Sequence, residues 1–127
     1  MSETDGSESP LVEASRLAAR LESFAAARNW DQFHSPKNLV MALANEVGEL
    51  TEIFQWMTEA ESRQAMTNPD CAAAIRGEVA DVLFYLIRLA DILGLDLDGV
   101  ARAKLALNEI RYPADKAFNS NKKYDQL

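Results

Sequence analysis

The sequence predicts an all-α domain built from four main helices. Apolar residues recur at helical spacing in four separate segments, and no segment alternates with period two over the length of a strand. Proline and glycine residues stand where those segments begin and end. The chain has 127 residues, of which 48% are apolar, and this size suits one globular domain with a single modest core.

The first ten residues differ in composition from the rest of the chain. They contain Ser, Gly, Pro and three acids but no basic residue, so residues 1–10 are predicted to be a disordered acidic tail. The folded domain is therefore expected over residues 11–127. Its first amphipathic helix is predicted over residues 11–28.

The second and third helices each begin at a residue that can cap a helix, followed directly by proline. Ser35 precedes Pro36, and the apolar spacing that follows predicts a helix over residues 36–58. Asn68 before a second proline repeats this start signal. The third helix is expected to end at Gly94, because glycine readily adopts the left-handed backbone conformation that closes helices.

The fourth helix is shorter and less apolar. Asp96 or Asp98 can cap it, and Pro113 ends it. The remaining segment, 114–127, is polar and is expected to be irregular or partly helical.

The charge balance excludes several classes of function. A net charge of −7 disfavours sequence-independent binding of nucleic acid, which requires a basic surface. No apolar run approaches the ~20 residues that span a bilayer, and the N-terminus has no secretory signal. We therefore expect a cytoplasmic protein without nucleic-acid or membrane partners.

Carboxylates interrupt the apolar faces of the second and third helices. Glu46 falls among leucines on one face, and Glu49 lies three residues further on. Glu78 and Asp81 repeat this spacing at the edge of the third apolar stripe, followed one turn later by Tyr85. Carboxylates three residues apart can converge on one ion. An all-oxygen set favours Mg²⁺ or Mn²⁺ over Zn²⁺.

Acidic residues on helices more often form solvated faces or pair with nearby Lys and Arg. Here no Lys or Arg other than Lys37 lies between Arg28 and Arg63. The second helix therefore offers Glu46 and Glu49 no basic partner of its own, which favours the metal-site interpretation.

Further motifs accompany the two carboxylate pairs in Glu46-Val47-Gly48-Glu49-Leu50 and Glu78-Val79-Ala80-Asp81-Val82-Leu83. They are Arg28-Asn29-Trp30-Asp31-Gln32-Phe33-His34, Phe54-Gln55-Trp56, the segment from Asn108 through Tyr112-Pro113, and Lys122-Lys123-Tyr124. Together these motifs resemble the MazG-like nucleotide pyrophosphohydrolases, most closely their dCTP pyrophosphatase branch. The resemblance spans about residues 11–127.

This resemblance implies a four-helix bundle of the all-α NTP pyrophosphatase type, assembled as a dimer of dimers. It also implies hydrolysis of a nucleoside triphosphate, dCTP or a modified cytosine analogue, to the monophosphate and pyrophosphate. Glu46, Glu49, Glu78 and Asp81 would hold Mg²⁺, with Mn²⁺ as an alternative. Glu46 is the candidate general base, and Glu49 is the other.

The remaining site residues follow from the same resemblance. Two tryptophans would stack on the base, other polar or aromatic groups would line its pocket, and cations would bind the phosphates. These residues are Trp30, Trp56, His34, Tyr85, Asn108, Lys104, Arg111, Lys122 and Lys123.

Two alternatives share parts of this pattern. An all-α dUTPase would use the same carboxylate scheme on another base. A non-enzymatic helical interaction module would use its acids to bind a basic partner and would need neither metal nor base pocket.

Overall fold

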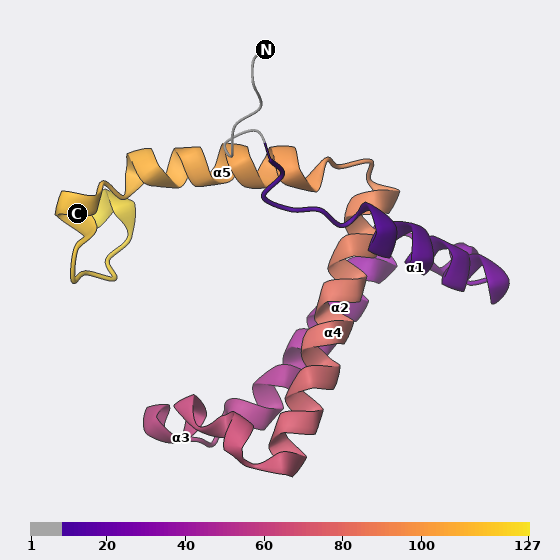
Figure 1. Ribbon diagram of the computed structural model, residues 1–127, viewed down its shortest axis with the longest axis horizontal. Helices are drawn as coiled ribbons and strands as arrows, with labels where there is room; N and C mark the ends of the chain where they lie inside the picture. Colours follow the sequence, from indigo (N-terminus) through magenta and orange to yellow (C-terminus); the bar gives the residue numbers. More distant parts are fainter. Residues whose placement is uncertain (1–8) are drawn as a thin grey trace. The chain divides into compact units, whose positions relative to one another are not determined.

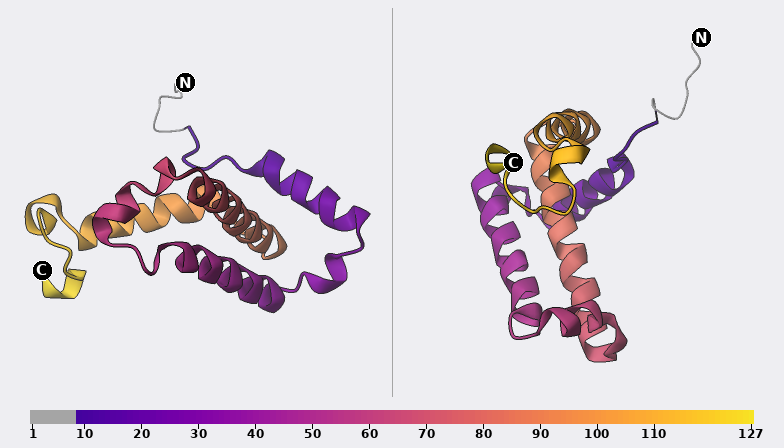
Figure 2. Two further views of the ribbon diagram at one scale, coloured as in Figure 1. Left: turned by 90° about the horizontal axis from the view of Figure 1, so that it is seen from below. Right: turned by 90° about the vertical axis from the view of Figure 1, so that its left-hand side faces the viewer.

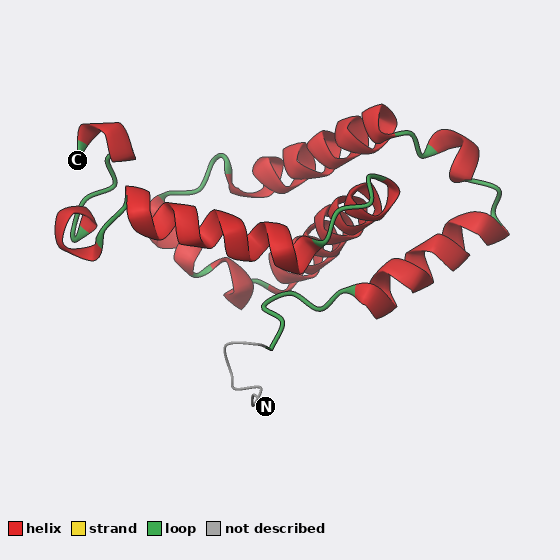
Figure 3. Cartoon of the chain, turned by 90° about the horizontal axis from the view of Figure 1, so that it is seen from above, coloured by secondary structure: helices red, strands yellow, loops and turns green. Residues whose placement is uncertain are grey.

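The computed structural model describes residues 9–127, and this part of the chain contains helices and loops but no strand (Figure 3). The predicted disordered tail lies almost entirely outside the described residues. The all-α class predicted from apolar periodicity is confirmed. The described residues include no helix that is both long and apolar enough to cross a membrane.

The described chain forms two compact units, Ser15–Gly94 and residues 9–14 with Leu95–Leu127. The first unit holds α1 (Ser15–Ala27), α2 (Pro36–Phe54), the short α3 (Glu59–Arg63) and α4 (Pro69–Ile92). The second holds α5 (Leu97–Arg111) and the single-turn α6 (Ala114–Ala117). The prediction of one domain over residues 11–127 stays a prediction.

The core of the Ser15–Gly94 unit lies between α2 and α4. These two helices run side by side and share the most extensive helix–helix contact in the described chain (Figures 1 and 2). Leu39 on α2 is 1% exposed, and Ile87 and Ala90 on α4 are also buried. The helix α1 also contacts α4, and its Ala25 is 1% exposed.

Both proline start signals act as predicted. Ser35 Oγ accepts the backbone N–H of Asn38 at 3.2 Å, and the helix begins at Pro36. Asn68 Oδ1 accepts the N–H of Asp70 at 3.0 Å at the start of α4. Gly94 has φ +68°, which confirms that a left-handed residue follows the third predicted helix.

Two predicted boundaries are wrong. Residues 11–14 are not helical, because Asp98 Oδ1 accepts the N–H groups of Leu11 and Val12 and draws this segment to the start of α5. The second helix ends at Phe54 rather than at residue 58. There Thr58 and Glu61 form a capping box that starts α3, so the chain must leave the α2 axis before Thr58.

Candidate active site

Three carboxylates converge where α2 packs against α4. Glu46 and Glu49 come from α2 and Glu78 from α4, and one ligand oxygen from each lies within 4.8 Å of the other two. The i, i+3 spacing places the α2 pair on adjacent turns of one face, and the α2–α4 contact brings the third carboxylate opposite. Asp81 lies outside this close group but lines the cavity beside Glu46.

Two oxygens of this cluster are buried without a partner. Glu46 Oε2 and Glu78 Oε2 are inaccessible to solvent and accept no hydrogen bond from the described residues. A buried carboxylate oxygen without a donor is costly unless a proton or a cation satisfies it. The cluster therefore fits a divalent cation with oxygen ligands.

The electrostatics of the cluster show how strongly these carboxyls interact. The neighbouring Glu78 carboxyl, followed by burial and Glu49, raises the pKa of Glu46 to about 7. For Glu78, interaction with Glu46 lowers the pKa, but burial and the charges of Glu49 and Asp81 outweigh it, so the net shift is upward. Without a cation, the cluster thus retains a proton close to neutral pH.

This proton predicts how metal-free stability depends on pH. The folded-state pKa of Glu46 is raised above its unfolded value of 4.5. The contribution of the protonated Glu46 carboxyl to folding stability is therefore fully present below pH 4.5 and is lost as the pH rises through about 7. In thermal melts in EDTA, the Tm of Glu46→Gln relative to that of wild type should rise by at least about 3 °C between pH 5 and pH 8. A constant difference in Tm between the two proteins would show that Glu46 titrates normally.

An aromatic cavity opens beside the carboxylates. Its volume is about 340 Å³, and its walls come from α1, α2, α4 and the loop between α1 and α2. Glu46 and Asp81 form its acidic side, and the rest is mainly aromatic and apolar. The lining residues are Leu21, Phe24, Ala25, Trp30, His34, Glu46, Asp81, Phe84, Tyr85 and Arg88.

A second cavity of about 350 Å³ shares three of these walls. Trp30, His34 and Tyr85 line both cavities, and Phe33 and Asn38 line only the second. The structure therefore brings three predicted base-pocket residues to one place within reach of the predicted metal ligands. Their role in binding stays a prediction.

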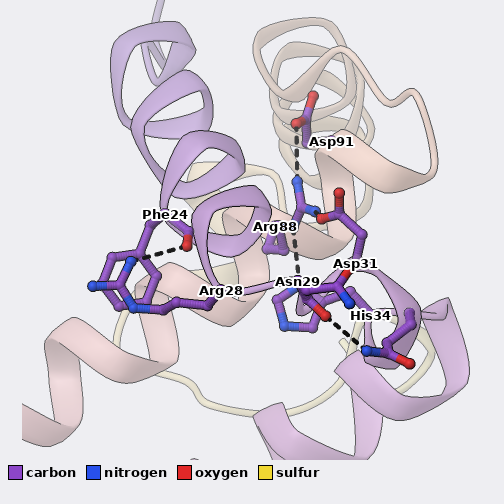
Figure 4. A network of polar contacts seen from close by, with 8 residues as sticks. Phe24, Arg28, Asn29, Asp31, His34, Arg88 and Asp91 are labelled. Atoms are coloured by element: carbon purple, nitrogen blue, oxygen red, sulfur yellow. Dashed lines mark hydrogen bonds and ion pairs between the residues drawn. The ribbon is translucent and has the colours of Figure 1, made fainter.

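Buried Arg88 also lines the first cavity and was not predicted from the sequence to belong to the site. Arg88 is 5% exposed and is the only fully buried charged residue in the described chain. It joins α4 to the loop that carries Trp30, through Asp31 and His34 (Figure 4). The available signal was a single basic residue inside the apolar run Leu86-Ile87-Arg88-Leu89-Ala90 of the third predicted helix.

Six predicted binding residues are not among those that line these two cavities. Trp56 is 87% exposed and lines neither of these cavities. The remaining five belong to the unit that contains α5, where the Arg111 guanidinium lies 4.4 Å from the centre of the Tyr124 ring. These five are Lys104, Asn108, Arg111, Lys122 and Lys123, and their participation in the site stays a prediction.

Known proteins resemble this chain in sequence and in fold. Human dCTP pyrophosphatase 1 is 44% identical over 120 residues, which cover 94% of this chain and 69% of the human protein. The rat protein of the same name is 42% identical over the same shares. A crystal structure of a pyrophosphatase from Archaeoglobus fulgidus superimposes with a TM-score of 0.72 at 34% identity, covering 78% of this chain and 91% of that one.

Together, the helical fold, the relatives and the solved structure define a class. The chain is an all-α hydrolase of the nucleotide diphosphatase type. The MazG-like family model matches residues 41–127, which include the whole carboxylate cluster. The chain belongs to the MazG-like family.

Proposed function

We propose that this enzyme is a Mg²⁺-dependent pyrophosphohydrolase of dCTP or a modified cytosine nucleotide, releasing the monophosphate and pyrophosphate. Such an activity would remove unwanted nucleotides from the cytoplasmic pool. The observation that carries the proposal is the carboxylate cluster with two unpartnered buried oxygens, situated at the wall of an aromatic cavity. The choice of cytosine is supported by the relatives named as dCTP pyrophosphatases.

The residues of the site fit two tasks, holding the metal ion and directing the hydrolysis. Glu46, Glu49 and Glu78, with Asp81 beside them, would hold Mg²⁺. When bound, Mg²⁺ would neutralise triphosphate charge and stabilise the charge that develops on the phosphoryl oxygens. A protein with a net charge of −7 repels a polyanionic substrate unless such a cation neutralises part of the negative charge.

The chain's own groups would then direct the hydrolysis. Glu46 accepts the proton of the attacking water, with Glu49 as the other candidate. The oxygen of that water bonds to the α phosphorus as the bond from this phosphorus to the α–β bridging oxygen breaks, and pyrophosphate leaves. Trp30 provides a flat surface for the base inside the cavity.

Exposed apolar side chains on α2 and α4 support the expected homo-oligomer, a dimer of dimers. Met41 on α2 is 62% exposed, and Val79 and Leu83 on α4 are 50% and 44% exposed. Such surface favours burial against a second copy. Ile87 on α4 is instead buried within the chain, at 4% exposure.

The reaction can be tested by isotope labelling. A screen of common and modified nucleoside triphosphates with Mg²⁺ should identify cytosine nucleotides as the preferred substrates. In ¹⁸O-labelled water, the label is expected in the monophosphate, because water attacks the α phosphorus. Label in pyrophosphate would place the attack at the β phosphorus, and inorganic phosphate as the first product would identify a phosphatase. A preference for dUTP would support the dUTPase alternative.

A further inference from the structure

Arg88 connects α4 to the short loop that carries two walls of the cavity. Its Nη2 donates to Asp31 Oδ1 at 2.7 Å, and its Nε donates to His34 Nδ1 at 3.1 Å. Its Nη1 lies 3.8 Å from Asp91 Oδ2 on the same helix. Figure 4 shows the guanidinium among these three side chains.

The bond to His34 determines which ring nitrogen carries the proton. A guanidinium has only donors, so Nδ1 of His34 must act as an acceptor and cannot carry a proton. The proton of the neutral ring therefore resides on Nε2. Burial, followed by the charge of Arg88, lowers the pKa of His34, while Asp31 raises it, and the net shift supports a neutral ring at pH 7.

The remaining nitrogen is available to a ligand. His34 lines both aromatic cavities, and no hydrogen bond from the described residues involves its Nε2. The His34 ring centre lies 6.3 Å from that of Trp30. A base stacked on Trp30 would therefore present its edge close to the His34 ring.

We propose that Arg88 is a positioning residue that holds His34 as its Nε2–H tautomer, so that the ring offers a fixed hydrogen-bond donor to an acceptor on the base. Cytosine carries two such acceptors on its edge, the O2 carbonyl and N3. The ion pair of Arg88 with Asp31 adds to this effect, because it holds the turn Asp31–Phe33, which joins Trp30 to His34 in the chain. The tautomer follows from the hydrogen bond alone, and only the reading of the base rests on the proposed function.

The tautomer can be measured directly because His34 is the only histidine in the chain. Long-range ¹H–¹⁵N correlation spectra of the ¹⁵N-labelled, ligand-free protein at pH 7 should show an unprotonated Nδ1 and a protonated Nε2. A proton on Nδ1, or a ring that averages both forms as in free histidine, would overturn the proposal. This measurement requires neither substrate nor activity.

Variants separate positioning from general stability. Arg88→Lys keeps the charge but lacks the fork that reaches both partners, so the nitrogen shifts of His34 should move towards those of free histidine. Asp91→Asn removes only the 3.8 Å pair and should leave the tautomer unchanged. Arg76→Lys, at an exposed position of the same helix, controls for the substitution itself. If Arg88→Lys folds with an unaltered tautomer, Arg88 does not set it.

Activity provides the second readout. Arg88→Lys should raise KM for dCTP by about tenfold with little change in kcat, the loss expected from one hydrogen bond of about 1.4 kcal/mol. If the wild type shows the predicted tautomer but hydrolyses no nucleotide, the proposed function is contradicted and the positioning role of Arg88 is left intact. If the wild type shows the predicted tautomer but Arg88→Lys has an unchanged KM, the proposed hydrogen bond from His34 to the base is contradicted.

Discussion

Replacing Glu78 by Gln should lower turnover by at least about 100-fold, while the fold survives. The substitution keeps the size of the side chain and removes the charge of one carboxylate in the three-residue cluster. It also leaves an amide where Glu78 Oε2 is buried without a partner. Loss of a ligand typically weakens metal affinity and activity together. Steady-state kinetics over a range of Mg²⁺ concentrations would measure both effects.

A matched control lies on the neighbouring helix. Glu52 is exposed on α2 and lies outside the cluster, so Glu52→Gln makes the same chemical change without touching the site and should keep full activity. Metal binding followed by calorimetry separates a lost ligand from a misfolded protein. Full activity of Glu78→Gln with an unchanged Mg²⁺ dependence would remove Glu78 from the metal site.

Local signals were sufficient to predict most of the fold. The start of α2 is encoded by adjacent Ser35 and Pro36, and the turn that follows α4 is encoded by Gly94. Both signals act through backbone atoms within a few residues, so a reading of the sequence can find them. The first residues of the predicted first helix were misassigned because their N–H partner, Asp98, is more than 80 residues away in the chain.

The residues of the candidate site also differ in whether a local signal in the sequence identifies them. Glu46 and Glu49 were recognisable because two acids interrupt an apolar helical face, and this anomaly is visible within four residues. Arg88 was missed because its two loop partners are 54 and 57 residues away. On the helix alone, an arginine beside an apolar stripe is unremarkable, since its long side chain usually reaches solvent.

The two tryptophans have different surroundings, although both were predicted to stack on the base. Trp30 precedes α2, lines both cavities and packs edge-on against Phe24, with ring centres 5.6 Å apart. Trp56 follows the end of α2 and is 87% exposed. The pair thus lies towards opposite ends of one helix. A base held in the cavity beside Glu46 would contact Trp30, so a stacking role for Trp56 would require the site of a second copy.

We expect Trp56→Ala to raise KM for pyrimidine triphosphates by about tenfold, the size of one lost stack, with a smaller effect on kcat. Because the side chain is 87% exposed in the single chain, its removal should leave the Tm of the dissociated protein unchanged. Kinetics would be measured together with mass by light scattering, which reports whether the oligomer persists. A normal KM in an intact oligomer would exclude Trp56 from nucleotide binding. A raised KM in an intact oligomer would place it in a site shared between copies.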